Sequence, residues 1–291
     1  MNHPANPIAT LPLKSADQSL IGSLLADLGK LDAQDIDKVL RLQHERGIRF
    51  GEAARNLGLV DESDIQHALS RQFNYPYLQP GQGGYPSELI AAYQPFGRQV
   101  ETLRSVRAQL MQTWFTNSRK MLAIASINQG EGASFFAANM AVLMAQLGRH
   151  TLLVDANLRR PRQHRIFALP NRHGLSDLLA RRAGLDACTK IPAFPHLTVL
   201  GAGTLAPNPQ ELLGGSSFPE LSDSISRRYD TVLVDMCAFA AGADALTVAA
   251  RVGGVLLVCR RNKTAMAGIQ TVSAQLARAG ATVVGAVLLD F

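Results

Sequence analysis

The chain has 291 residues and a net charge of +6, with 47% hydrophobic and 18% charged residues. These proportions support one large domain or two smaller ones and exclude a chain that is disordered throughout. The basic runs lack interleaved aromatic residues, which disfavours nucleic-acid binding, and no apolar run approaches the roughly 20 residues of a membrane span. Three cysteines at spacings that fit neither zinc sites nor disulfides, and a start without a signal-peptide pattern, predict a cytoplasmic protein.

A duplicated helical unit is the first predicted element. The sequence from Ile21 aligns with the sequence from Phe50 at one constant offset. Each copy predicts two helices around a glycine turn, and one copy is too small to bury its apolar stripe, so the two should pack together. We expect a disordered tail over 1–18 and this domain over 19–78. The turn glycines are Gly29 and Gly58, and the expected caps of the second helices are Asp32 and Asp61.

Strands that alternate with helices are predicted for the rest of the chain. A Pro-, Gly- and Tyr-rich segment over 79–97 is expected to be a linker, followed by one domain over 98–291. The alternation predicts an α/β fold, a doubly wound and mostly parallel sheet with helices on both faces. The strands are MLAIAS, TLLVDA, LTVLGA, TVLVDM, GVLLVCR and TVVGAVLLD, with helices near Ser134, Gly174, Ser217, Ala243 and Ala265.

A glycine-rich turn follows the first of these strands. A buried strand, a glycine turn and a helix N-terminus form a phosphate cradle, because backbone N–H groups and the helix dipole converge on one place. The usual P-loop ends in Gly-Lys-Ser/Thr, whereas here Gly132 is followed by Ala133 and Ser134. Taken alone, a tight turn that needs glycine explains this pattern equally well.

Acidic residues end the next predicted strands. Asp155 ends one strand, with Asn157 just beyond it, and Asp235 ends another. The C-terminal ends of parallel strands lie beside the ligand crevice of such a sheet, and Asp235 would suit holding Mg²⁺ through water. A helix N-cap explains either aspartate alone, but two of them beside a glycine-rich turn favour the crevice.

These stretches resemble the bacterial tyrosine autokinases of polysaccharide export, which are relatives of the MinD and ParA P-loop ATPases. The resemblance is carried by SINQGEGASFFAAN at 126–139, LLVDANLRRPRQH at 152–164 and APNPQELL at 206–213. It covers nearly all of the chain after Val100. The branch that also carries the N-terminal repeat is the EpsG-type chain-length-determinant kinases.

The resemblance implies a site for ATP and Mg²⁺. It places Asp155 as the group that helps to activate the attacking hydroxyl, with Asn157 beside it and Asp235 as the Walker B residue. Mg²⁺ would be held by Ser134, Asp155 and Asp235. The loop residues that would bind the nucleotide are Gly130, Glu131, Gly132, Ala133, Ser134 and Phe135.

The resemblance also implies partners. Glu101, Arg104 and Arg107 fit a ring-assembly motif whose spacing puts them on one helix face, although a solvated, self-paired face is the simpler explanation of that spacing. We expect self-association, docking on a membrane chain-length-determinant protein, and a position at the inner membrane through that partner.

Several departures from the family surround the site. Ala133 replaces the lysine that neutralises the phosphates, Leu289 replaces an asparagine that contacts the base, and the last tyrosine is Tyr229, so no tyrosine-rich tail is present. An active autokinase, a pseudokinase scaffold and, more weakly, a ParA- or MinD-like positioning ATPase are the alternatives. Arg149, Arg159 and Lys263 are candidates to replace the missing charge.

The N-terminal repeat resembles the MshE/GspE N-terminal domain of secretion and pilus ATPases, some of which bind cyclic di-GMP. The second copy has Arg49 and Gly51 of that motif, but the first copy lacks the arginine. A helical protein-docking module is the interpretation that we favour, with cyclic di-GMP binding as the alternative.

Overall fold

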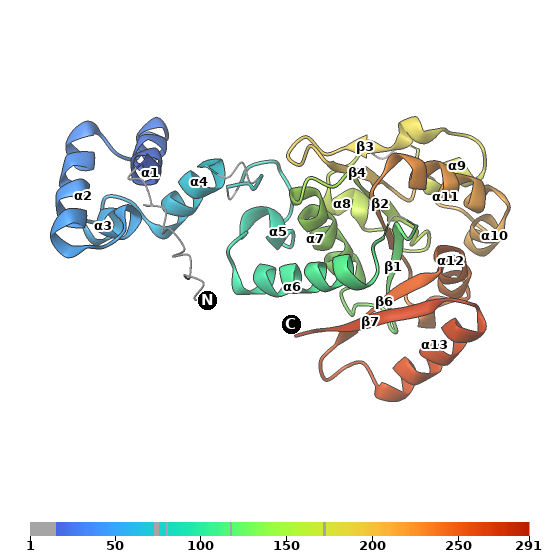
Figure 1. Ribbon diagram of the computed structural model, residues 1–291. Coiled ribbons are helices and arrows are strands. Elements are labelled where there is room, and N and C mark those ends of the chain that lie inside the picture. Colours follow the sequence, from blue (N-terminus) through green and yellow to red (C-terminus); the bar gives the residue numbers. More distant parts are fainter. Residues whose placement is uncertain (1–15, 73–75, 80, 117, 171–172, 291) are drawn as a thin grey trace, which may run out of the picture. The chain divides into compact units, whose positions relative to one another are not determined.

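The computed structural model describes residues 16–72, 76–79, 81–116, 118–170 and 173–290, and the side chains from 21 onward within them. The chain divides into two compact units, Met1–Pro76 and Tyr77–Phe291. Figure 1 shows a wholly helical first unit and a second unit in which helices surround a sheet.

The first unit contains the duplicated pair of helices. Gly29 and Gly58 adopt left-handed φ angles of 67° and 69°, as predicted for helix-ending glycines. The two copies share one core, in which Leu25 and Val39 pack with Phe50 and Ala68. The expected tail lies outside the described residues except for its last three, which form the start of the first helix. The helices are α1 (Ala16–Asp27), α2 (Ala33–Arg46), α3 (Phe50–Asn56) and α4 (Glu62–Gln72).

The second unit is a sheet covered on both faces. Within the described residues the strand order is β3-β4-β2-β5-β1-β6-β7, and every pairing is parallel except β3 with β4. The strands are β1 (Met121–Ser126), β2 (Thr151–Asp155), β3 (Thr189–Lys190), β4 (Leu197–Leu200), β5 (Thr231–Asp235), β6 (Gly254–Arg260) and β7 (Thr282–Leu289).

Alternate residues of each strand enter opposite cores, because successive side chains of a strand point to opposite faces. On β1, Leu122 and Ile124 join the core with α5, α6 and α7, whereas Ala123 and Ala125 join the core with α9 to α13. The helices are α5 (Ile90–Tyr93), α6 (Arg98–Thr113), α7 (Ala133–Gln146), α8 (Gln163–Ile166), α9 (Leu175–Leu179), α10 (Pro209–Gly214), α11 (Ser217–Arg228), α12 (Asp244–Val252) and α13 (Met266–Arg278), with 3₁₀ turns η1 (Leu185–Ala187) and η2 (Phe239–Ala241).

The segment expected to be a linker, 79–97, instead belongs to the second unit, where it packs against α7. Leu89 and Ala91 are fully buried. The side chain of Asn139 on α7 accepts a hydrogen bond from the Ala91 N–H at 2.8 Å and donates one to the Glu88 carbonyl at 3.0 Å. The Pro and Gly content favours an irregular backbone, which is why composition alone predicted a linker. The contacts with Asn139 satisfy backbone hydrogen-bonding groups of this irregular segment, so it can be buried.

The described helices include none that is both long enough and apolar enough to cross a membrane.

Candidate phosphate-binding site

The turn between β1 and α7 has the backbone that its glycines permit. Gly130 and Gly132 have φ angles of 77° and 96°, in the region that side-chain-bearing residues rarely adopt. Gly132 is the N-cap of α7, so the first helical N–H groups, from Ala133 onward, face the turn. The helix dipole adds a positive potential there. This geometry is that of an anion cradle, at the place the sequence predicts.

The side chain of Glu131, one of the loop residues expected to bind the nucleotide, points into the protein and not toward the cavity. It is fully buried, and its carboxylate accepts hydrogen bonds from the Asn128 N–H at 2.8 Å, from the Asn128 side-chain amide at 2.9 Å and from the Thr264 hydroxyl at 2.6 Å. The carboxylate therefore holds the shape of the loop and ties it to the segment after β6. Only the backbone of Glu131 remains for a phosphate.

Asp155 and Asp235 end neighbouring strands and are both fully buried. The Asp155 carboxylate accepts the N–H groups of Asn157, Arg162 and Gln163 at 3.2, 3.0 and 2.9 Å. It thus organises the segment that leads into α8. One oxygen of Asp235, Oδ2, accepts the side-chain amide of Gln163 at 2.7 Å. The other, Oδ1, has no hydrogen-bond partner within the described residues.

Burial raises the pKa of both carboxyls. For Asp155, three backbone hydrogen bonds oppose this effect. For Asp235, the charge of Asp155 raises the pKa further, against hydrogen bonds from Gln163 and Ser134. Two buried carboxylates side by side favour a bound cation or a bound proton. Because Asp235 Oδ1 is also unpaired, the donor set fits Mg²⁺ or a water bound to it.

Gln163 is a site residue that the sequence did not reveal. It is fully buried at the start of α8, and its amide donates to the Ser134 carbonyl at 3.1 Å as well as to Asp235. It therefore links the phosphate loop to the end of β5. Glutamine has no motif signal at this position, so only the fold shows the link.

A cavity of about 180 Å³ lies against the loop. It brings together the predicted residues Gly130, Gly132, Ala133, Ser134 and Asn157. The Asn157 side-chain oxygen accepts the Arg160 N–H at 3.1 Å. The guanidiniums around this cavity already have partners, as Arg159 pairs with Asp244 at 2.6 Å, Arg160 bonds Gln129 at 2.8 Å and Arg162 pairs with Glu88 at 2.8 Å.

Another cavity, of about 530 Å³, also touches Gly130 and Gly132. It is lined by Phe135, by Leu103 of α6 and by Leu289 at the end of β7. Leu289 occupies the position where the resemblance expects an asparagine for the base, and leucine offers an apolar contact in place of a hydrogen bond. A flat aromatic group next to the phosphate loop would pack against these side chains, while Thr102 and Asp290 offer polar atoms in the same cavity.

The α6 residues of the expected assembly motif make contacts within the chain. Arg104 pairs with Glu101 at 2.9 Å, and the Arg107 guanidinium donates to the Leu143 carbonyl in the last turn of α7 at 2.9 Å. Glu101 and Arg104 thus pair on their own helix, whereas Arg107 is held by α7. Assembly through this face therefore stays a prediction.

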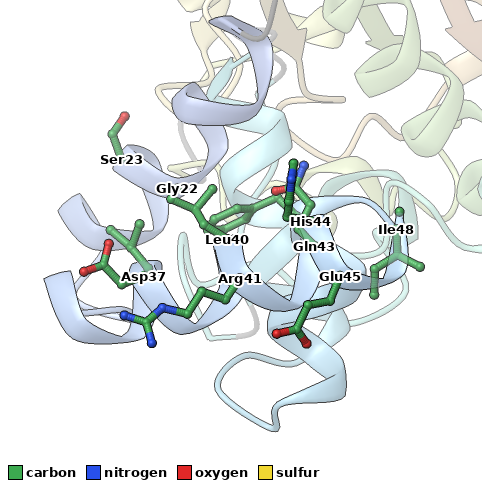
Figure 2. Close-up of a pocket in the computed structure, with 12 residues that line it drawn as sticks. Gly22, Ser23, Asp37, Leu40, Arg41, Gln43, His44, Glu45 and Ile48 are labelled. Atoms are coloured by element: carbon green, nitrogen blue, oxygen red, sulfur yellow. The ribbon is translucent and has the colours of Figure 1, made fainter.

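The first unit has a hollow of about 1120 Å³, drawn in Figure 2. Its lining comes mainly from α2, including Leu40 and Arg41, while Arg49 and Gly51 of the cyclic di-GMP motif are not part of it. A Cβ on Gly22 would lie 3.2 Å from the Phe50 ring, and one on Gly51 would lie 3.2 Å from the side chain of Ile65. These glycines therefore allow close packing of the helices within this unit.

Known proteins share much of the second unit's sequence. The tyrosine-protein kinase YwqD of Bacillus subtilis is 32% identical over 200 residues, which cover 69% of this chain and 84% of that protein. The tyrosine-protein kinase Wzc of Salmonella typhi is 31% identical over 202 residues, which cover 69% of this chain and only 28% of Wzc. The chain thus spans less than a third of that relative. No protein-family profile matches the chain.

Solved structures share the fold. The kinase domain of the Escherichia coli tyrosine kinase ETK superposes with a TM-score of 0.68 at 28% identity, covering 73% of this chain and 82% of that one. The cell-division ATPase MinD of Pyrococcus furiosus superposes with a TM-score of 0.51 at 25% identity, covering 58% of this chain and 71% of that one. The predicted α/β fold with its mostly parallel sheet is confirmed.

Proposed function

The chain belongs to the family of bacterial tyrosine-protein kinases, and from this premise we propose that it is a nucleotide-binding regulator of exopolysaccharide chain length or export whose phosphoryl transfer is weak. One observation carries the proposal. The glycine loop and the Asp155–Asp235 pair keep the form of a nucleotide site, while the loop position of the phosphate-binding lysine is the buried methyl group of Ala133.

The residues of the site divide the work between them. The loop N–H groups and the Ser134 hydroxyl would hold the phosphates, and Ser134 with Asp235 would hold Mg²⁺. ATP, when bound with Mg²⁺, would supply the γ-phosphoryl group for a tyrosine hydroxyl and leave as ADP, and the Asp155 carboxylate would accept the proton of that hydroxyl. Phosphoryl transfer depends almost wholly on positioning and charge stabilisation, so a loop without its cation binds better than it reacts.

The pseudokinase alternative is the limiting case of this proposal, in which binding persists and transfer is lost. Ala133 and Leu289 favour it, because each removes an interaction with one end of the nucleotide. The scaffold would act by changing its docking on a membrane chain-length-determinant partner, and would be cytoplasmic and peripheral at the inner membrane through that partner. The first unit would be the EpsG-type docking module, and the α6 face would mediate self-association.

The test uses radiolabelled ATP with Mg²⁺ and the full chain. We expect slow or no incorporation by the unaltered protein and a gain of about 10²–10³ in Ala133→Lys, the usual effect of one preorganised charge-stabilising donor. Leu147→Lys is the matched control, because Leu147 is exposed at the C-terminal end of α7 and a lysine there adds the same charge away from the loop. A measurable rate of incorporation in the unaltered chain that equals the rate of Ala133→Lys would contradict weak transfer. The Kd for ATP, measured in parallel, separates binding from transfer.

A further inference from the structure

Lys263 lies beside the phosphate loop. A Cβ built on Gly130 would be 3.9 Å from the Lys263 ammonium nitrogen. Gly130 lines both the small cavity at the loop and the larger one, so this ammonium lies beside the glycine that the two cavities share. Lys263 is exposed, and within the described residues its side chain makes no hydrogen bond or ion pair. It is a free cation next to a cradle that lacks one.

The turn that carries Lys263 is fixed to the loop. The Thr264 hydroxyl donates to the Glu131 carboxylate at 2.6 Å and accepts the Arg260 N–H at 2.8 Å. The N–H groups of Lys263 and Thr264 both donate to the Arg260 carbonyl, and Asn262 takes a left-handed φ of 58° to close the turn. Glu131 is itself part of the phosphate loop. The backbone of Lys263 is therefore held in register with the cradle, while its side chain keeps its freedom.

The two arginines that the sequence offered as replacements for the loop lysine, Arg149 and Arg159, are bound elsewhere. Arg149 bonds Thr231 and Asp230 at the start of β5, the opposite end of the strand from Asp235. Arg159 is held by a two-point ion pair with the buried Asp244. Moving Arg159 to a phosphate would leave the Asp244 carboxylate buried without its partner, which costs free energy. Moving the Lys263 side chain breaks no such ion pair among the described residues.

We propose that Lys263 replaces the missing loop lysine, reaching the phosphate chain of a nucleotide from the turn after β6 and not from the start of α7. The proposal rests on the nucleotide site proposed above. A lysine ammonium on a flexible four-carbon stem suits this task, since it binds phosphate as a point charge without a fixed fork geometry. The site would thereby recover ground-state phosphate binding without the catalytic position of the loop lysine.

The experiment measures the Kd of the full-length protein for ATP with Mg²⁺ and for inorganic tripolyphosphate. We expect Lys263→Ala to weaken both by about ten- to hundredfold, the range for a hydrogen bond to a charged group, and Lys263→Arg to restore most of the loss. Arg261→Ala is the charge-matched control, because Arg261 lies on the same turn and pairs with Asp290 at 2.8 Å. Its Kd should equal that of the unaltered chain.

A second background makes the result specific. In Ala133→Lys, where the loop has its own cation, removal of the Lys263 side chain should cost much less than in the unaltered chain. Equal Kd values for the unaltered chain and Lys263→Ala overturn the inference and leave the nucleotide site in place. Absence of binding by the unaltered chain overturns both. If Arg261→Ala weakened binding as much as Lys263→Ala, the effect would come from the net charge of the turn, and the specific role of Lys263 would be overturned.

Discussion

Asp155 and Asp235 face each other in register at the C-terminal ends of β2 and β5, and neither carboxylate is exposed to solvent. Burial raises the pKa of both, and the charge on Asp155 raises that of Asp235 further. The folded chain therefore carries an electrostatic strain at neutral pH that a proton or a cation relieves. Such a pair lowers the stability of the fold as long as neither a proton nor a cation is bound.

The pair predicts an unusual pH dependence. A carboxyl whose folded pKa is raised above its unfolded value stabilises the fold fully below the unfolded pKa, and this contribution is lost as pH rises through the folded pKa. For Asp235 the loss begins above the ordinary value of 3.8. Asp235→Asn cannot ionise, and the Gln163 amide can turn to present its oxygen to the new NH₂ group.

Urea unfolding without Mg²⁺ at pH 5 and pH 8 checks this. The stability of Asp235→Asn relative to the unaltered chain should rise with pH, by about 1.4 kcal/mol for each unit of pKa difference titrated in that range. The comparison between variant and parent cancels the titration of groups that do not interact with Asp235, and the relief of Asp155 in the variant acts in the same direction. If the difference in unfolding free energy between Asp235→Asn and the unaltered chain were the same at pH 5 and pH 8, the raised pKa of Asp235 would be refuted.

Gln163→Leu should loosen the phosphate loop. The substitution removes the amide that bridges Ser134 and Asp235, and leaves a buried carbonyl and carboxylate oxygen without this donor. We expect a loss of about 1–3 kcal/mol in unfolding free energy, together with weaker nucleotide binding. Gln275→Leu is the control, because that side chain is exposed on α13 and does not line the cavities at the loop. An unchanged melting temperature in Gln163→Leu would show that the bridge contributes nothing.

Gly174→Ala should be poorly tolerated. A Cβ at this residue would overlap the Gly201 carbonyl oxygen and the Gly203 nitrogen, which are backbone atoms that cannot move aside. Overpacking of this kind costs about 1–3 kcal/mol or more. At Gly201 itself a Cβ would meet only the side chain of Leu169 at 3.5 Å, an ordinary contact. Thermal unfolding of the two variants should therefore separate them clearly, and similar melting temperatures would argue against this close approach.

The sequence predicts those features of the fold that come from local patterns. Strand ends place Asp155 and Asp235 at one edge, because parallel strands share the direction of their carboxyl ends. The brace from Glu131 to Thr264 spans 133 residues and the bridge from Gln163 to Asp235 spans 72, and neither has a spacing that a motif records. The burial of 79–97 is a tertiary effect as well, since the partner that satisfies its backbone, Asn139, is on α7. What remained hidden is therefore the set of contacts between distant segments.

The duplicated unit allows a matched test of helix capping. Asp32 accepts the Asp35 N–H at 2.8 Å, and at the equivalent place Asp61 accepts the Asp64 N–H at 2.9 Å. The second copy adds a reciprocal bond, from the Asp61 N–H to the Asp64 carboxylate at 3.1 Å. Because each cap satisfies an otherwise unpaired N–H of the first turn, Asp32→Ala should weaken α2, and Asp61→Ala should weaken α4 to a similar extent. The reciprocal bond comes from the Asp61 backbone N–H, which alanine keeps.

Hydrogen exchange of the full chain reads each helix separately. We expect backbone amides of α2 to exchange about fivefold faster in Asp32→Ala, with α4 unchanged, and those of α4 to exchange faster by a similar factor in Asp61→Ala, with α2 unchanged. Asp32→Ser and Asp61→Ser keep a capping oxygen and should restore most of the protection. If both alanine variants accelerated both helices equally, the first unit would open as one body, and the caps would act on the shared core and not on their own helices.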